Sequence, residues 1–72
     1  MSELFEIDDT RTLRREEAAA RLRALADMLA RNNSVEFVRG GKQVTVRIPD
    51  EVELKVELEI GEDNELEIEL TW

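Results

Sequence analysis

Residues 52–72 read VELKVELEIGEDNELEIELTW, and this stretch decides the fold. On both sides of the break at residues 61–64, apolar residues alternate with polar residues that are mostly glutamate. Because successive side chains of a β-strand point to opposite faces, the alternation predicts two strands with one apolar and one acidic face. If all four break residues formed the loop, the strands would present mismatched faces, so we expect an odd loop length or a bulge.

Two registers of this hairpin bring the apolar faces together. One pairs Glu57 with Glu67 and Glu59 with Glu65. The other pairs Glu59 with Glu67 and Glu57 with Glu69. Either register places two Glu–Glu pairs directly opposite each other, and like charges in that position destabilise a sheet.

A second hairpin is expected upstream, from residues 34–39 and residues 42–48. Gly40-Gly41 between them is a two-residue turn suited to positive φ. This turn pairs apolar residues with one another: Phe37 with Val44 and Val35 with Val46.

A proline-led turn at residues 49–51 would connect the two hairpins. A three-residue loop there places Val46 opposite Leu54 and Arg47 opposite Glu53, a favourable charge pair. The four strands would then form one antiparallel meander.

Residues 13–31 change to a helical period, and four apolar side chains define the buried stripe: Ala18, Leu22, Leu25 and Leu29. If Arg14 is the N-cap, Glu17 occupies the capping-box position; Thr12 is the alternative cap. Asn32-Asn33 can adopt the left-handed conformation that ends a helix.

Residues 3–7 predict a short first strand with Phe5 and Ile7 facing inward. The expected fold is therefore α+β, in the order β-α-β-β-β-β, as a single domain over residues 1–72. One helix packs on one face of a mostly antiparallel, strongly twisted sheet. The helical crossover should be right-handed if the first strand lies parallel to the second.

The net charge of −8 is unevenly distributed. Residues 49–72 contain ten acids and one lysine, whereas residues 11–48 contain nine bases and four acids. Phosphates would be repelled by the acidic strands, so nucleic acid and anionic membranes are not expected as partners there. The start of the chain does not resemble a signal peptide, and no apolar run approaches the ~20 residues of a membrane span. We expect a cytoplasmic protein, and the acid-rich, lysine-poor composition fits a salt-rich cytoplasm.

The residues available for catalysis are few. Histidine, cysteine and tyrosine are absent, which leaves carboxylates, two lysines and hydroxyls. A pair such as Glu57 and Glu67 would lie on a solvated sheet face with nothing to exclude water. We therefore expect no enzyme activity, no cofactor, no metal site and no small-molecule substrate.

Three segments resemble a known family: REEAAA with LAD (residues 15–20 and 25–27), VTVRIPD (44–50) and LEIELTW (66–72). Together they are similar to the Amphi-Trp domain proteins, small acidic proteins of haloarchaea named for an amphipathic strand that ends in tryptophan. The resemblance implies the fold and a saline habitat, and it brings no catalytic residue.

Trp72 is the residue of greatest interest. In the alternation of this strand, Trp72 falls on the apolar side. It either fills the core at the sheet edge or contacts another subunit, and the second role is suggested because tryptophan is enriched at binding hot spots. One helix ~10 Å across cannot cover a five-stranded sheet ~20–24 Å wide. We therefore expect a homodimer, with the contact formed by Trp72, Leu70, Val52 and Leu54.

Two function classes are compatible with these features. The first is a non-catalytic, self-associating interaction or structural module that acts through the apolar face around Trp72. The alternative is an acidic nucleic-acid mimic or inhibitor, whose glutamate face occupies a basic site on a protein partner. An apolar contact persists at high salt whereas an electrostatic one is screened, so a pull-down at high salt separates them.

Overall fold

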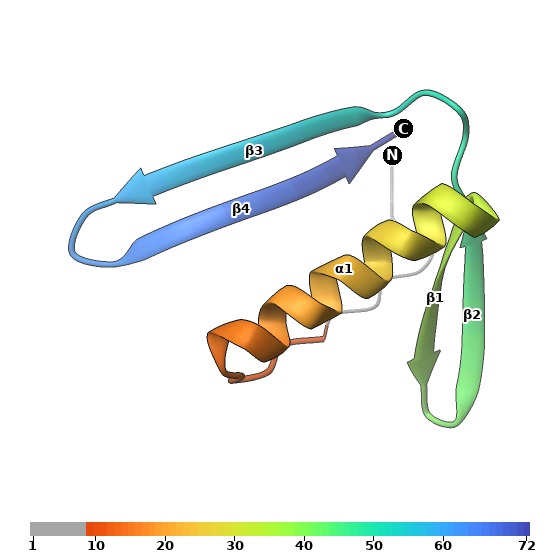
Figure 1. The fold of residues 1–72 in the computed structure, drawn as a ribbon, viewed down its shortest axis with the longest axis horizontal. Helices are drawn as coiled ribbons and strands as arrows, with labels where there is room; N and C mark the ends of the chain where they lie inside the picture. Colours follow the sequence, from red (N-terminus) through yellow and green to blue (C-terminus); the bar gives the residue numbers. More distant parts are fainter. Residues whose placement is uncertain (1–8) are drawn as a thin grey trace.

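The computed structural model describes residues 9–72, as one helix followed by four antiparallel strands (Figure 1). These elements are α1 (Arg15–Asn32), β1 (Ser34–Arg39), β2 (Lys42–Arg47), β3 (Glu53–Ile60) and β4 (Asn64–Thr71). The predicted α+β class and the order of helix and strands are confirmed. The strand expected at residues 3–7, with Phe5 and Ile7, lies outside the described residues.

Helix α1 begins after Arg14, as one of the two predicted caps requires. The backbone of Arg14 is extended (φ −69°, ψ 152°), and its N–H donates to Glu17 Oε1 at 3.0 Å. A guanidinium group has no acceptor, so the Arg14 side chain cannot complete the reciprocal half of a capping box. At the other end Asn33 is left-handed (φ 55°, ψ 35°), which confirms the predicted stop.

The β1–β2 hairpin has the predicted register. Gly40 and Gly41 form the expected two-residue turn. Their φ values are 57° and 78°, a backbone conformation that residues other than glycine rarely adopt. The predicted apolar pairs are present: Phe37 with Val44 and Val35 with Val46. The N–H of Ile48 donates to the Asn33 carbonyl at 2.8 Å, which extends the pairing one step beyond the strands.

The predicted continuation of this hairpin into a four-stranded meander is wrong. The strands form two separate two-stranded sheets, β1–β2 and β3–β4, so Val46 does not pair with Leu54, nor Arg47 with Glu53. The ladder that includes Ile48 stops at Pro49, which has no N–H to donate. Instead of a tight turn, the segment after Ile48 leads β3 away from β2 (Figure 1).

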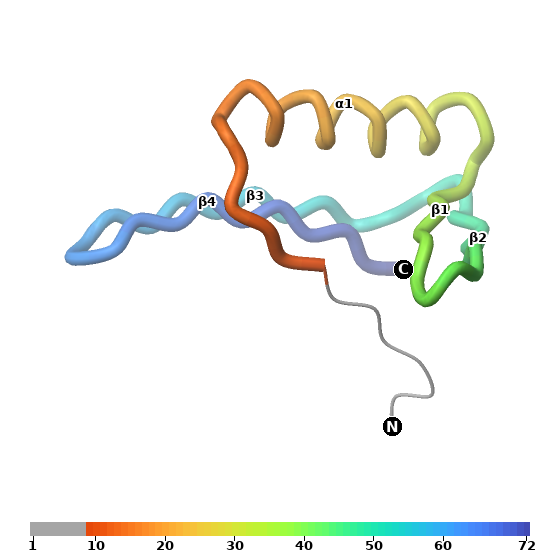
Figure 2. Tube along the Cα trace, turned by 90° about the horizontal axis from the view of Figure 1, so that it is seen from below, coloured from red at the N-terminus to blue at the C-terminus, as the bar shows by residue number. Residues whose placement is uncertain are grey.

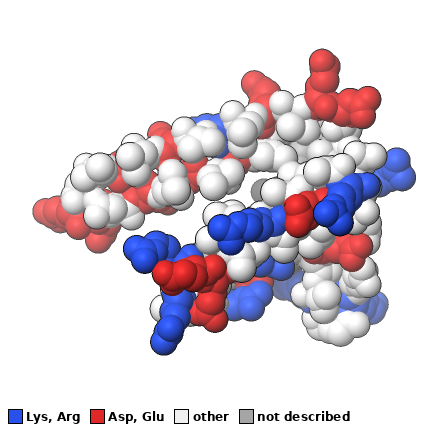
Figure 3. Space-filling view, in the orientation of Figure 1, with Lys and Arg blue, Asp and Glu red and all other residues white. Residues whose placement is uncertain are grey.

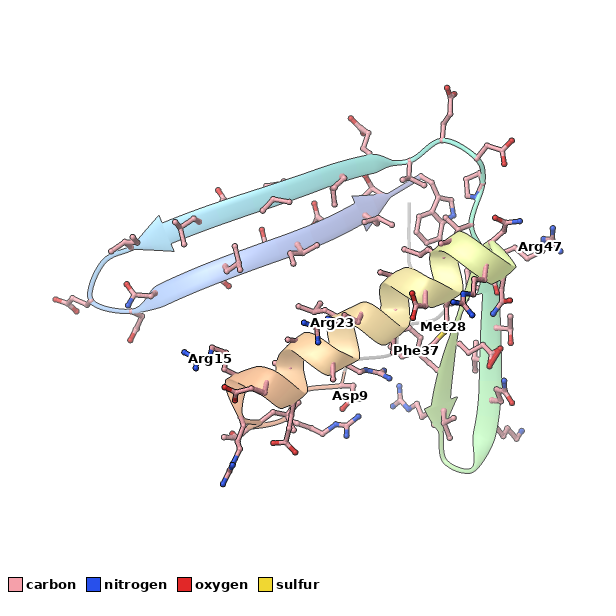
Figure 4. The ribbon with its side chains drawn as sticks, in the orientation of Figure 1. Asp9, Arg15, Arg23, Met28, Phe37 and Arg47 are labelled. Atoms are coloured by element: carbon pink, nitrogen blue, oxygen red, sulfur yellow. The ribbon has the colours of Figure 1, made fainter. Side chains whose placement is uncertain are left out.

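Helix α1 packs against β1. The N–H of Glu36 donates to Met28 Sδ at 3.4 Å, and the Arg21 guanidinium lies 5.8 Å from the centre of the Phe37 ring. Met28 and Phe37 lie between α1 and β1 (Figure 4). Among the described residues no apolar residue is buried, and Ser34, at 6% exposure, is the one buried residue.

The molecule is open for its size. Its accessible surface is 6994 Å², whereas a compact monomer of this mass exposes ~4,600 Å². Its radius of gyration is 14.0 Å, against ~11 Å for a compact chain of this length. Figure 2 shows α1 to one side of the strands, with the β3–β4 hairpin projecting past the start of the helix. No helix within residues 9–72 is long and apolar enough to cross a membrane.

Candidate interaction surface

The β3–β4 hairpin separates its side chains cleanly between two faces. Ile60 pairs with Asn64, so the loop has three residues, and the predicted odd length is confirmed. Inside the loop, the N–H of Gly61 donates to Asn64 Oδ1 at 3.4 Å. Three apolar pairs follow on one face: Leu58 with Leu66, Val56 with Ile68, and Leu54 with Leu70. We call these six residues, together with Ile60 beside the turn, the hairpin apolar face.

The exposure of this face rises from the base of the hairpin towards its turn. Leu70, near the base, is half-buried, and Ile68 is 48% exposed. Further along, Leu58 and Leu66 are 66% and 63% exposed, and Ile60 beside the turn reaches 77%. Leu70 is therefore the best-covered position of this face, whereas Leu54 opposite it is 62% exposed and the half nearest the turn lies in solvent.

A groove of about 460 Å³ lies where α1, β1 and the base of the hairpin meet. Its walls are almost entirely apolar: Leu22, Leu25, Ala26, Leu29, Val35, Phe37, Ile48, Ile68, Leu70 and Trp72. Because this groove is open, the two halves of the molecule do not close over a common core.

The four predicted contact residues lie together at the base of the hairpin. Trp72 and Leu70 line the groove, and Leu54 is the cross-strand partner of Leu70. Val52 and Leu70 also line a smaller cavity of about 230 Å³ beside Pro49. Trp72 is 61% exposed and Leu54 62%. Trp72 therefore combines a position in the groove with exposure to solvent.

The predicted contact did not include the exposed apolar residues further along the hairpin, which are Val56, Leu58, Ile60 and Leu66. These residues share the alternation that identified Leu54 and Leu70. The alternation of apolar residues does not indicate how far along the hairpin the helix reaches.

The opposite face of the hairpin is acidic, and Figure 3 shows acidic side chains along this part of the molecule. Of the two predicted registers, the structure has the one that pairs Glu57 with Glu67 and Glu59 with Glu65. Lys55 Nζ lies 3.5 Å from a carboxylate oxygen of Glu57 and 3.6 Å from one of Glu67. One like-charged pair is therefore bridged by a cation.

A second, polar groove of about 650 Å³ lies beside β1, and acids and bases both line it. Arg11 Nη2 lies 2.9 Å from Asp9 Oδ2, and this hydrogen bond lowers the pKa of Asp9 and raises the pKa of Arg11. No group of three potential metal ligands occurs within residues 9–72. With three arginines and two acids in its lining, the groove presents no uniformly basic surface.

These features define a small acidic α+β domain whose last hairpin presents one apolar and one acidic face. The chain belongs to the Amphi-Trp domain family, whose model matches residues 1–72, the whole chain. The resemblance seen in the sequence is thereby confirmed. No curated protein and no solved structure matches the chain.

Proposed function

We propose that this protein is a non-catalytic interaction module that associates with a second copy of itself through the hairpin apolar face and Trp72. The observation that carries the proposal is the exposure of this face: six of its side chains are between 48% and 77% exposed. They are Leu54, Val56, Leu58, Ile60, Leu66 and Ile68. Monomeric proteins seldom expose a contiguous apolar surface of this kind, and such surfaces mark sites of association.

The absence of catalytic side chains in the sequence supports the non-catalytic part of the proposal. A chain without histidine, cysteine or tyrosine has only carboxylates and two lysines as titratable side chains apart from arginine, and neither type ordinarily exchanges its proton near neutral pH.

Sedimentation equilibrium at about 1 M NaCl and tens of micromolar protein tests self-association. At that salt concentration the Debye length is ~3 Å, so interactions between surface charges are screened and an apolar contact between the chains remains. We expect a dimer of the 8.3 kDa chain. Leu54→Ser should weaken it, because serine removes apolar surface from the contact. Val38→Ser is the matched control, since Val38 is 75% exposed on β1, outside the hairpin apolar face. A monomeric wild-type protein would contradict the proposal.

The acidic face favours a second candidate function, binding to a basic site on another protein. All strand residues of β3 are exposed, so its carboxylates are available to such a partner. This binding should disappear at high salt, whereas self-association through the apolar face should persist. A pull-down from cell extract at about 0.1 M and 2 M salt distinguishes the two.

The proposal includes the location expected from the sequence, a salt-rich cytoplasm. Its support is the composition, with 18 acids against ten bases and only two lysines among the bases. Fractionation of cells that produce the tagged chain tests the compartment.

A further inference from the structure

The part of the hairpin apolar face nearest the turn has no cover among the described residues. Ile60, Leu58 and Leu66 are 77%, 66% and 63% exposed. We call these three residues the distal patch. Figures 1 and 2 show, from two directions, that the turn of the β3–β4 hairpin extends past the first turn of α1. The helix of the same chain therefore does not reach the distal patch.

We propose that a second copy of this chain covers the distal patch with its own distal patch, so that the two hairpins pack face to face and run in opposite directions. This inference rests on the proposed function and specifies how the two copies meet. The same residues contribute from both sides, as in any contact with twofold symmetry. In each copy, the partner would cover the end of the hairpin, which lies beyond the reach of α1.

The distribution of charge favours contact between faces over contact between strand edges. Neighbouring strands in one sheet are ~4.8 Å apart, so joining two hairpins edge to edge would bring their glutamate rows close together. Two sheets packed face to face are ~10 Å apart, and their outer faces lie further apart still. Since residues 49–72 contain ten acids and one base, the face-to-face arrangement keeps most like charges apart.

The antiparallel arrangement also places opposite charges near each other at both ends of the contact. Because the hairpins run in opposite directions, the turn of each copy arrives near the start of the partner's α1. The turn contains Glu62 and Asp63, and the helix start presents Arg14 and Arg15, followed by Glu16 and Glu17; Arg15 Nη2 lies 3.1 Å from Glu16 Oε1. The Arg15 side chain is 92% exposed, and Figure 4 shows it at the end of α1 nearest the turn. The positive end of the helix dipole also favours nearby carboxylates.

The surface of the monomer is large enough for such a contact. The chain exposes 6994 Å², about half as much again as the ~4,600 Å² of a compact monomer of this mass. The excess is larger than the ~800 Å² that each partner of a standard interface covers. Covering the distal patch therefore leaves the rest of the open surface, including the acidic face, in solvent.

The distal patch is tested by sedimentation equilibrium of the full chain. Leu58→Ser and Leu66→Ser, which alter cross-strand partners, should each raise the dimer Kd by about tenfold or more. Val38→Ser should leave it unchanged. Far-UV circular dichroism of each variant, measured at a concentration where the wild type is dimeric, checks that helix content is retained.

The charged ends are tested by mixing two variants at about 0.15 M NaCl, where charges within ~8 Å still interact. Arg15→Glu alone and Glu62→Arg alone should each weaken the homodimer several-fold, since each opposes like charges at both ends of the contact. When the two proteins are mixed, opposite charges face each other at both ends, and heterodimer formation should return to the wild-type level. Failure of the mixture to recover would overturn the antiparallel arrangement.

The result also distinguishes this geometry from the proposed function. If the dimer survives Leu58→Ser and Leu66→Ser but is lost in Trp72→Ala, the contact lies at the base of the hairpin. That outcome overturns the face-to-face arrangement and leaves self-association intact. A wild-type chain that remains monomeric overturns both.

Discussion

At the scale of single residues, Lys55 separates two otherwise similar pairs of glutamates. It is the one base within residues 49–72, and it contacts both members of the Glu57–Glu67 pair, at 3.5 and 3.6 Å. The Glu59–Glu65 pair stands directly opposite in the same way and has no ion pair of this kind among residues 9–72. The two pairs should therefore respond differently to neutralisation.

We predict that Glu59→Gln with Glu65→Gln stabilises the protein at about 0.1 M NaCl more than Glu57→Gln with Glu67→Gln. Relief of one cross-strand like pair contributes a few tenths of a kcal/mol to ~1 kcal/mol, which corresponds to roughly 1–6 °C in Tm for a chain of this length. Neutralising Glu57 and Glu67 also removes the two contacts of Lys55, so its gain is smaller. Thermal unfolding measures both variants; at about 2 M NaCl, where screening extends to ~3 Å, the difference should vanish. Equal gains at low salt would contradict the role given to Lys55.

At the scale of the elements, helix α1 begins with only half of a capping box. Glu17 accepts from the N–H of Arg14, but the Arg14 side chain has no acceptor to offer in return. We predict that Arg14→Ser raises the free energy of unfolding by about 1 kcal/mol, since a serine oxygen can accept from a free N–H of the first turn. Arg14→Ala is the matched control, because it removes the same charge without supplying an acceptor. Thermal unfolding of both variants decides it, and equal melting temperatures would show that the cap is not limiting.

Strand registers and helix ends that depend on a short local turn are the features of this fold that the sequence predicts. Gly40-Gly41 and the alternation around it set the β1–β2 register, because a two-residue turn leaves no freedom in pairing. The left-handed Asn33 and the odd loop of β3–β4 follow from equally local rules. The β2–β3 pairing was mispredicted, although its charges and apolar residues match. Pairing rules say which residues suit each other, whereas the path of residues 48–52 decides whether the strands meet.

At the scale of the whole molecule, the sequence predicted more apolar surface than one helix can cover, and the structure has such a surface. The prediction placed the contact around Trp72, because tryptophan is a frequent hot-spot residue. The structure places greater exposure at the other end of the hairpin, on Leu58 and Ile60. The difference arises because exposure depends on the length and tilt of α1 relative to the hairpin. No periodicity in the sequence contains that information.

The separation of the strands into two hairpins also has a consequence for how the protein reaches its final state. Each described strand is paired with its immediate neighbour along the chain. Such local pairings form within ~1–10 μs, because only short loops must close. Encounter of two chains would then be the slow event in refolding. We predict that the rise in light scattering that reports association accelerates in proportion to protein concentration, whereas most of the far-UV circular dichroism returns earlier at a rate independent of concentration. Stopped-flow refolding over a tenfold range of concentration measures both, and refolding with no concentration-dependent rise in light scattering would mean that the chain acquires its final packing alone.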